Sequence, residues 1–174
     1  MNDALELDID PRQFRHVMGR FATGVTVISV SDADEVRGMT ANAFMSGSLE
    51  PPLCIVSIAK RARMHDHIMA AEHFGVSILA ETQFDISEHF AGRPNPALEV
   101  EFERFGPVPV LANACARIAT RIAVRHDCGD HTIFIGHILR LEADDRPPLI
   151  YHAGRYRSLD RQRLDHNVGV PEFW

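Results

Sequence analysis

Several residue types and motifs are scarce in this sequence, and each shortage excludes a class of protein. Lysine occurs once, at Lys60, and 24 acidic residues outnumber 18 basic ones to give a formal net charge of −6. A net-negative chain is a poor general ligand for DNA or RNA, so we expect no nucleic-acid partner. No run approaches the ~18 apolar residues of a membrane-spanning helix, and residues 1–10 lack the apolar core of a secretory signal. We therefore expect a cytoplasmic protein with no membrane partner.

Cysteine is also scarce. Cys54, Cys115 and Cys128 form no CxxC pair, and their odd number and long spacings indicate no disulfide framework. The apolar surroundings of Cys54 and Cys115 are typical of a core, and free thiols suit a reducing cytoplasm. The chain has no GxGxxG, P-loop or GxSxG motif, so two common nucleotide-binding folds and the commonest hydrolase fold have no support.

The chain has enough hydrophobic residues to form the core of one domain. Hydrophobic residues make up 45% of the 174 residues, which suffices for a stable core. We expect a single domain over 1–174, with its folded part at 10–159 and a C-terminal tail at 160–174. Asp10-Pro11 is typical of a helix start, and Phe14, Val17, Met18 and Phe21 at helical spacing predict that this helix buries one face.

Two more short helices are predicted, at 64–73 and 82–90, and the rest of the pattern is β. Strands are expected at residues 25–30, 37–44, 53–58, 74–79, 114–125, 131–141 and 149–153. The proline-containing segment 91–113 is expected to be mostly loop. Because strands follow one another without regular helical crossovers, the pattern favours an antiparallel barrel or sandwich over a doubly wound sheet.

Ten histidines raise the question of a metal site. His65 and His67, followed by Glu72 and His73, come closest to a metal-binding pattern. This stretch is predicted to be helical, and residues two apart in a helix point about 200° apart. His65 and His67 therefore do not face one ion, and we expect surface histidines and no metal site.

Three other stretches favour ligand binding, although each has a plainer interpretation. Small residues in the strand segment 38–44 would let a flat ligand approach the backbone, but they also suit an ordinary core strand. The basic turn 60–63 before a helix would bind an anion, or simply face solvent. Gly129-Asp130-His131 would be a hairpin turn, or would point His131 at a ligand. The residues alone leave these alternatives open.

Taken together and in order, six segments resemble the short-chain flavin reductases of two-component monooxygenases. The resemblance covers residues 14 to 159 and rests on FRHVMGRFATGVTVI, GMTANAF, SLEPPLCIVSI, FAG, GDHTIFIGHIL and PLIYHAGRYRSL. It implies a mainly β, Greek-key split β-barrel with a few short helices, usually a homodimer with the flavin near the subunit interface. It also implies hydride transfer from NADH, or alternatively NADPH, to FMN or FAD, with transient flavin transfer to a monooxygenase component.

Carried over residue by residue, the resemblance implies a set of binding residues and requires no catalytic side chain. Flavin would contact three groups: Met39, Thr40, Ala41, Asn42 and Ala43; Ser57, Ile58 and Ala59; and Phe90, Ala91 and Gly92. The flavin phosphate would lie on the turn Arg61, Ala62, Arg63 and Met64, and NADH would contact His131, Tyr156 and Arg157.

This chain departs from the family pattern at two places. Ala62 and Met64 stand where the family commonly has hydroxyl side chains, and His137 replaces the usual acid in a role that we do not assign. Two other functions stay open: a flavin oxidase of the pyridoxamine-phosphate-oxidase type on the same barrel, and a non-enzymatic flavin- or haem-binding module. Turnover of pyridoxine phosphates would indicate the first, and tight cofactor binding without NADH oxidation the second.

Overall fold

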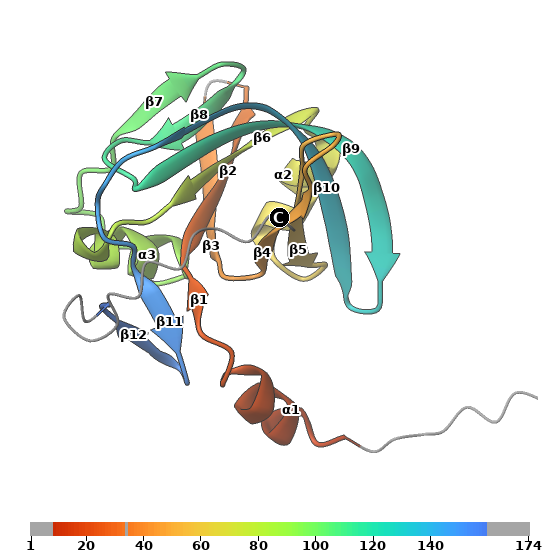
Figure 1. Ribbon diagram of the computed structural model, residues 1–174, viewed down its shortest axis with the longest axis vertical. Helices are drawn as coiled ribbons and strands as arrows, with labels where there is room; N and C mark the ends of the chain where they lie inside the picture. Colours follow the sequence, from red (N-terminus) through yellow and green to blue (C-terminus); the bar gives the residue numbers. More distant parts are fainter. Residues whose placement is uncertain (1–8, 34, 160–174) are drawn as a thin grey trace, which may run out of the picture.

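The body of the molecule is a seven-stranded sheet in which every neighbouring pair is antiparallel (Figure 1). The computed structural model describes residues 9–33 and 35–159, so the expected tail 160–174 lies outside it. In spatial order the strands are β3 (Glu35–Ala41), β2 (Thr26–Asp32), β6 (His73–Ile78), β9 (Ala116–Cys128), β10 (His131–Ala143), β5 (Leu53–Ala59) and β4 (Phe44–Ser48).

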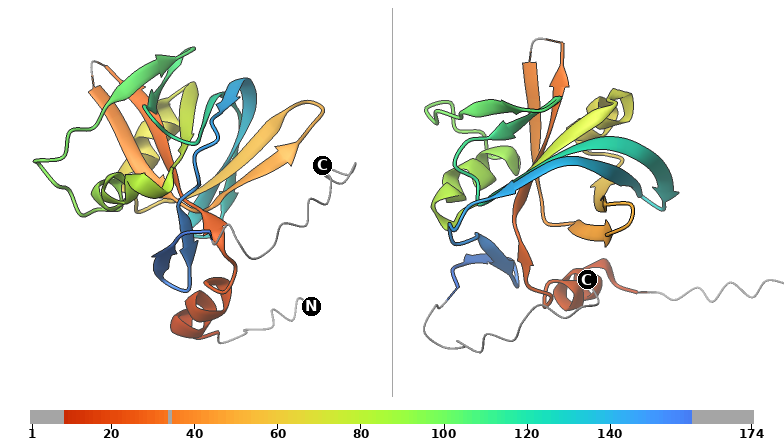
Figure 2. Two further views of the ribbon diagram at one scale, coloured as in Figure 1. Left: turned by 60° about the vertical axis from the view of Figure 1, so that its left-hand side comes forward. Right: turned by 45° about the horizontal axis from the view of Figure 1, so that its top comes forward.

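The two edges of this sheet, β3 and β4, are consecutive in the chain and are separated only by Asn42 and Ala43. Three Cα steps span at most about 11 Å, so the edges must come together at this point. The sheet is therefore rolled into a barrel that is split between β3 and β4, and its two halves splay apart from that junction (Figure 2). This architecture confirms the expected mainly β, split-barrel fold class. The single strand expected at 37–44 is broken by the junction.

Shorter elements cover the ends of the barrel. Helix α2 (Arg63–Ala70) follows β5, and the turn Glu81–Gln83 leads into α3 (Phe84–Phe90). A separate sheet joins β1 (Thr23–Gly24), β11 (Ile150–His152) and β12 (Arg155–Arg157), next to α1 (Pro11–Met18). No helix in the described part of the chain is long and apolar enough to cross a membrane.

The core lies inside the curl of the sheet. Phe74 on β6 and Phe134 on β10 are both fully buried there, together with Ile58 on β5. Cys54 joins the same cluster, and burial raises the pKa of its thiol to about 11. Cys115 is also buried. These two cysteines are core residues, as predicted.

Two expectations about local structure are wrong. Helix α1 does not bury its apolar face: Phe14 is 55% exposed and Val17 is 58% exposed, and the helix ends at Met18. Helical spacing shows that one face is apolar, but it does not show whether the same chain covers that face. The segment 91–113 is also more than loop, because it contains the hairpin β7 (Phe102–Phe105) and β8 (Val108–Leu111). These strands are only four residues long, and the prolines around them hid their alternation.

Candidate functional site

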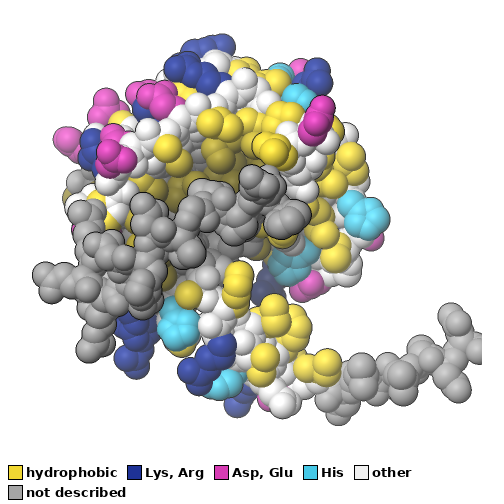
Figure 3. Space-filling model, viewed as in Figure 1, with side chains coloured by type: hydrophobic (Ala, Val, Ile, Leu, Met, Phe, Trp, Pro, Cys, Tyr) yellow, Lys and Arg dark blue, Asp and Glu magenta, His cyan; other side chains and the backbone are white. Residues whose placement is uncertain are grey.

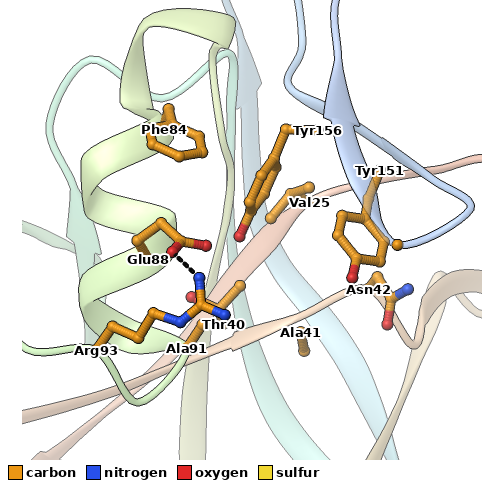
Figure 4. A pocket seen from close by; sticks show the side chains of 11 residues that line it. Val25, Thr40, Ala41, Asn42, Phe84, Glu88, Ala91, Arg93, Tyr151 and Tyr156 are labelled. Atoms are coloured by element: carbon orange, nitrogen blue, oxygen red, sulfur yellow. Dashed lines mark hydrogen bonds and ion pairs between the residues drawn. The ribbon is translucent and has the colours of Figure 1, made fainter.

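A cavity of about 410 Å³ lies beside the junction of β3 and β4, between the end of β3, helix α3 and the β11–β12 hairpin (Figure 4). We call it the candidate cavity. Its volume falls in the range of small-molecule sites, roughly 300–1,000 Å³. Five of the residues predicted to bind ligand line it: Thr40, Ala41, Asn42, Ala91 and Tyr156. The GMTANAF strand, the FAG motif and the C-terminal motif, far apart in sequence, therefore meet at one cavity.

A partly buried hydrogen-bond network connects three of the walls. The Thr40 hydroxyl donates to the Ser87 carbonyl oxygen at 2.7 Å, and Ser87 Oγ lies 2.9 Å from the Tyr156 hydroxyl. Ser87 is fully buried on α3. Burial also raises the pKa of the Tyr156 phenol above its usual value, so this group is neutral at physiological pH. The network holds β3, α3 and β12 in a fixed arrangement around the cavity.

Sequence reasoning missed several residues of the cavity, including Phe84, Glu88, Arg93 and Tyr151. The rings of Phe84 and Tyr151 both meet Tyr156 edge to face, at centroid distances of 4.9 Å and 5.3 Å. Glu88 and Arg93 form an ion pair on the opposite wall (Figure 4). Two of the missed residues, Phe84 and Glu88, could have been found from their spacing. Together with Ala91, which was predicted, they are spaced to lie on one side of a helix.

Three other predicted flavin contacts, Met39 on β3 and Phe90 and Gly92 at the end of α3, flank the cavity without lining it. The Phe90 ring occupies the space above Gly38, where an added Cβ would lie 2.8 Å from Phe90 Cε1. That glycine therefore makes room for a side chain of this protein. Gly92 follows α3 with a φ of +93°, a conformation that glycine adopts readily. Arg157 lines a neighbouring cavity with Phe84 and Tyr156.

The wall continues from the junction to the basic turn. The Ser57 N–H donates to the Ala43 carbonyl oxygen at 3.0 Å, which places β5 directly beside residues 42 and 43. The side chains of Ile58 and Met64 are buried in the core, so only their backbone can face a ligand. Arg61 and Arg63 are exposed, and Arg63 is the first residue of α2. Apart from Asn42, none of these residues lines the candidate cavity itself.

The basic turn lies against the GDH hairpin between β9 and β10. Ala59 pairs with His131 across the sheet, and the Lys60 N–H donates to the Asp130 carbonyl oxygen at 2.9 Å. Lys60 Nζ donates to the Gly129 carbonyl oxygen at 2.7 Å and forms an ion pair with Asp127. The structure thus brings together the predicted phosphate turn and the predicted nicotinamide-side histidine, as a second group of site residues.

The histidines weighed as metal ligands have separate partners. His65 Nε2 lies 2.9 Å from Thr132 Oγ1, whereas His67 Nδ1 lies 2.9 Å from Asp32 Oδ2. The two imidazoles therefore face different strands, in line with their positions on α2. His137 lies opposite Leu53, and its Nδ1 is buried with no hydrogen-bond partner among the described residues.

Replacing His131 by alanine is expected to raise KM for NADH and to change flavin binding less. His131 Nδ1 lies 2.7 Å from Asp130 Oδ1, and this contact lowers the pKa of the Asp130 carboxyl. The side chain is positioned beside the turn, and the hydride transfer that the resemblance implies would not need it as an acid. Steady-state kinetics with varied NADH and a separate flavin titration test this. An unchanged KM, or a collapse of kcat alone, contradicts it.

Chemically, the candidate cavity can bind and orient a planar ring. Thr40, Ala41 and Ala91 provide a floor with little side-chain bulk, and the aromatic residues provide a wall. The cavity's one carboxylate, Glu88, is engaged by Arg93. This donor set fits a ring cofactor such as flavin better than it fits acid–base or nucleophilic catalysis.

Several known proteins are similar to this chain over most of its length. The family model "Flavin reductase like domain" matches residues 18–160. An NADH-dependent flavin reductase of Rhodococcus sp is 42% identical over 95% of this chain and 96% of its own length. The reductase component of 4-hydroxyphenylacetate 3-monooxygenase of Thermus thermophilus is 40% identical over 84% of this chain and 95% of its own. The solved structure of flavin reductase PheA2 superimposes with a TM-score of 0.84 at 42% identity, over 87% of this chain and 99% of that one. The chain therefore belongs to the family of flavin reductase like domains.

Proposed function

We propose that this protein is an NADH-dependent flavin reductase that reduces FMN or FAD and supplies the reduced flavin to a partner monooxygenase. The observation that carries the proposal is the meeting of Thr40, Ala41, Asn42, Ala91 and Tyr156 at one cavity of suitable size. The relatives support the same activity, because one is an NADH-dependent flavin reductase and another is the reductase component of a monooxygenase.

The residues of the chain bind and orient, and the bound flavin supplies the redox chemistry by accepting the hydride of the nicotinamide. Thr40 to Ala43 and Ser57 to Ala59 form one continuous wall for the flavin, held by the Ser57–Ala43 hydrogen bond. Tyr156, held by its hydrogen bond to Ser87, lines the opposite side, where it would shield the rings from water. Backbone N–H groups along the wall would stabilise negative charge on the reduced ring.

NADH oxidation by the purified protein is expected to require added flavin. The reason is that the cavity residues contribute no redox group of their own. The assay measures NADH absorbance with FMN, FAD, riboflavin or no flavin added, after flavin has been removed from the protein. Full activity without flavin contradicts the proposal. Oxidation of pyridoxine phosphates would select the oxidase alternative, and tight flavin binding without NADH oxidation would select the binding module.

We also propose that the protein is a homodimer in the cytoplasm. Phe14, Val17 and Met18 on α1, together with Phe21, are all more than half exposed in the single chain. A second copy that covers this face would remove a costly apolar surface from water. The three cysteines of the chain are free, as suits a reducing compartment.

Sedimentation at micromolar concentration is expected to show a dimer. The variant Val17→Asp places a charge on the exposed face of α1 and is expected to dissociate it, whereas Arg12→Asp, on the same helix but off the apolar face, serves as the matched control. A monomeric wild-type protein at this concentration would refute the proposal.

A further inference from the structure

The end of the molecule next to the candidate cavity carries positive charge that the proposed function does not use. No acidic residue occurs in the segments 11–31 and 146–159, and each segment holds three arginines. The chain as a whole has a net charge of −6, so this separation of charge is pronounced. Arginine and histidine side chains gather where α1 approaches the β11–β12 hairpin (Figure 3).

These two segments are joined and enclose a cavity. The Ala153 N–H, in the turn between β11 and β12, donates to the Gly19 carbonyl oxygen at 2.8 Å. Between them lies a cavity of about 430 Å³, which we call the basic cavity. Its lining includes the basic residues Arg12, Arg15, His16 and Arg20.

The cationic side chains of the basic cavity are available to a ligand. Arg20 Nη2 lies 3.2 Å from His16 Nε2, so two basic groups are held side by side. Within residues 9–33 and 35–159, Arg12, Arg15 and Arg20 form no ion pair with a carboxylate. An anion placed among them would gain charge-assisted hydrogen bonds without displacing an acidic side chain of the described residues.

The basic cavity is contiguous with the candidate cavity. Gly154 lines both of them. It has a φ of +76°, and an added Cβ there would meet no atom within 4 Å, so residue 154 places no side chain between the two cavities. A ligand with its ring in the candidate cavity can therefore extend past Gly154 into the basic cavity.

We propose that the basic cavity binds the adenosine diphosphate half of a dinucleotide whose reactive ring lies in the candidate cavity. The inference rests on the proposed flavin reductase function, which brings two such ligands, NADH and FAD, to this site. The guanidinium groups of arginine match phosphate oxygens in a forked geometry and stay charged at every physiological pH. Because the family resemblance already assigns Arg61 and Arg63 to the flavin phosphate, the second anion site suits NADH in particular.

The double variant Arg15→Ala/Arg20→Ala tests this by direct binding. Both side chains belong to a helix or turn with little buried surface, so the variant is expected to fold, and its melting temperature verifies that. Calorimetric titration with ADP-ribose, which carries the diphosphate but no redox ring, is expected to show affinity reduced by about tenfold or more. Raised salt should weaken binding to the wild type more than to the variant. The control Arg37→Ala/Arg104→Ala removes the same charge from the far end of the barrel and is expected to bind as the wild type does.

Two further comparisons identify the source of the diphosphate. If it is NADH, the variant raises KM for NADH but not for reduced nicotinamide mononucleotide, and the Kd values of FAD and FMN stay equal to those of the wild type. If it is FAD, the Kd of FAD rises and that of FMN does not. Equal ADP-ribose affinity in variant and wild type, or no ADP-ribose binding by either, overturns the inference. A wild type that binds ADP-ribose but does not oxidise NADH with flavin contradicts the proposed function instead.

Discussion

Replacing both Arg61 and Arg63 by alanine will weaken FMN binding about ten- to hundredfold and leave riboflavin binding unchanged. The flavin phosphate is dianionic, and Ala62 and Met64 offer it no side-chain donor. Ala62 also makes no side-chain capping bond, so the first N–H groups of α2 stay available and add a partial positive charge. A charge-assisted hydrogen bond contributes about 1.5–3 kcal/mol, which corresponds to that range of Kd. Arg63 should account for more of the loss than Arg61, because it begins the helix.

Fluorescence titration with FMN, FAD and riboflavin at two salt concentrations measures the effect. Salt is expected to weaken FMN binding more than riboflavin binding, since exposed charges are screened. Arg104→Ala, which removes an exposed arginine from β7, is the matched control. If FMN and riboflavin lose affinity equally, or neither loses any, the arginines face solvent and the backbone alone holds the phosphate.

Replacing Gly75 by alanine will destabilise the fold by about 3 kcal/mol or more. Gly75 lies on β6 where β2 and β8 approach, and an added Cβ would overlap the Pro109 carbonyl oxygen and lie 2.8 Å from Ser29 Oγ. That hydroxyl donates to the same carbonyl oxygen at 2.6 Å. Overpacking costs about 1–3 kcal/mol, and breaking a buried hydrogen bond adds a similar penalty. In a chain of this size the Tm falls by about 10 °C.

Denaturant unfolding of the two glycine variants measures this loss against a control. Gly24→Ala places its Cβ where no atom lies within 4 Å, at a φ outside the left-handed region, and is expected to change stability little. A free energy of unfolding for Gly75→Ala equal to that of Gly24→Ala would show that β8 can move away at little cost.

Local pattern and motif order predicted most of this architecture, and the failures have physical causes. The β-branched residues of segment 114–125 and the continuous apolar run of 131–141 identified the two long strands. Local pattern could not reveal that the segment around Asn42 is a junction between two sheet edges, because that depends on how seven strands close in space. Nor could it show that the apolar face of α1 stays exposed within the described part of the chain.

Residues of the candidate site could be predicted where they belong to a sequence motif. They could not be predicted where only the folding of the chain brings them to the cavity. Thr40 and Tyr156 belong to motifs and were found. Arg93 reaches the cavity only because the loop after α3 returns to Glu88, and nothing in its sequence neighbourhood indicates that. His65 looked like a candidate metal ligand, yet its hydrogen bond to Thr132 makes it part of the support beneath the GDH hairpin.

The position of Lys60 gives this protein a built-in chemical reporter. It is the chain's only lysine, and its amine joins the phosphate turn to the tip of the β9–β10 hairpin through Gly129 and Asp127. An amine-directed acylating reagent consequently has one side chain to modify, and that side chain lies between two parts of the site. The rate of acylation relative to the free α-amino group reports how often the Lys60 amine leaves its contacts with Gly129 and Asp127, with no engineered label.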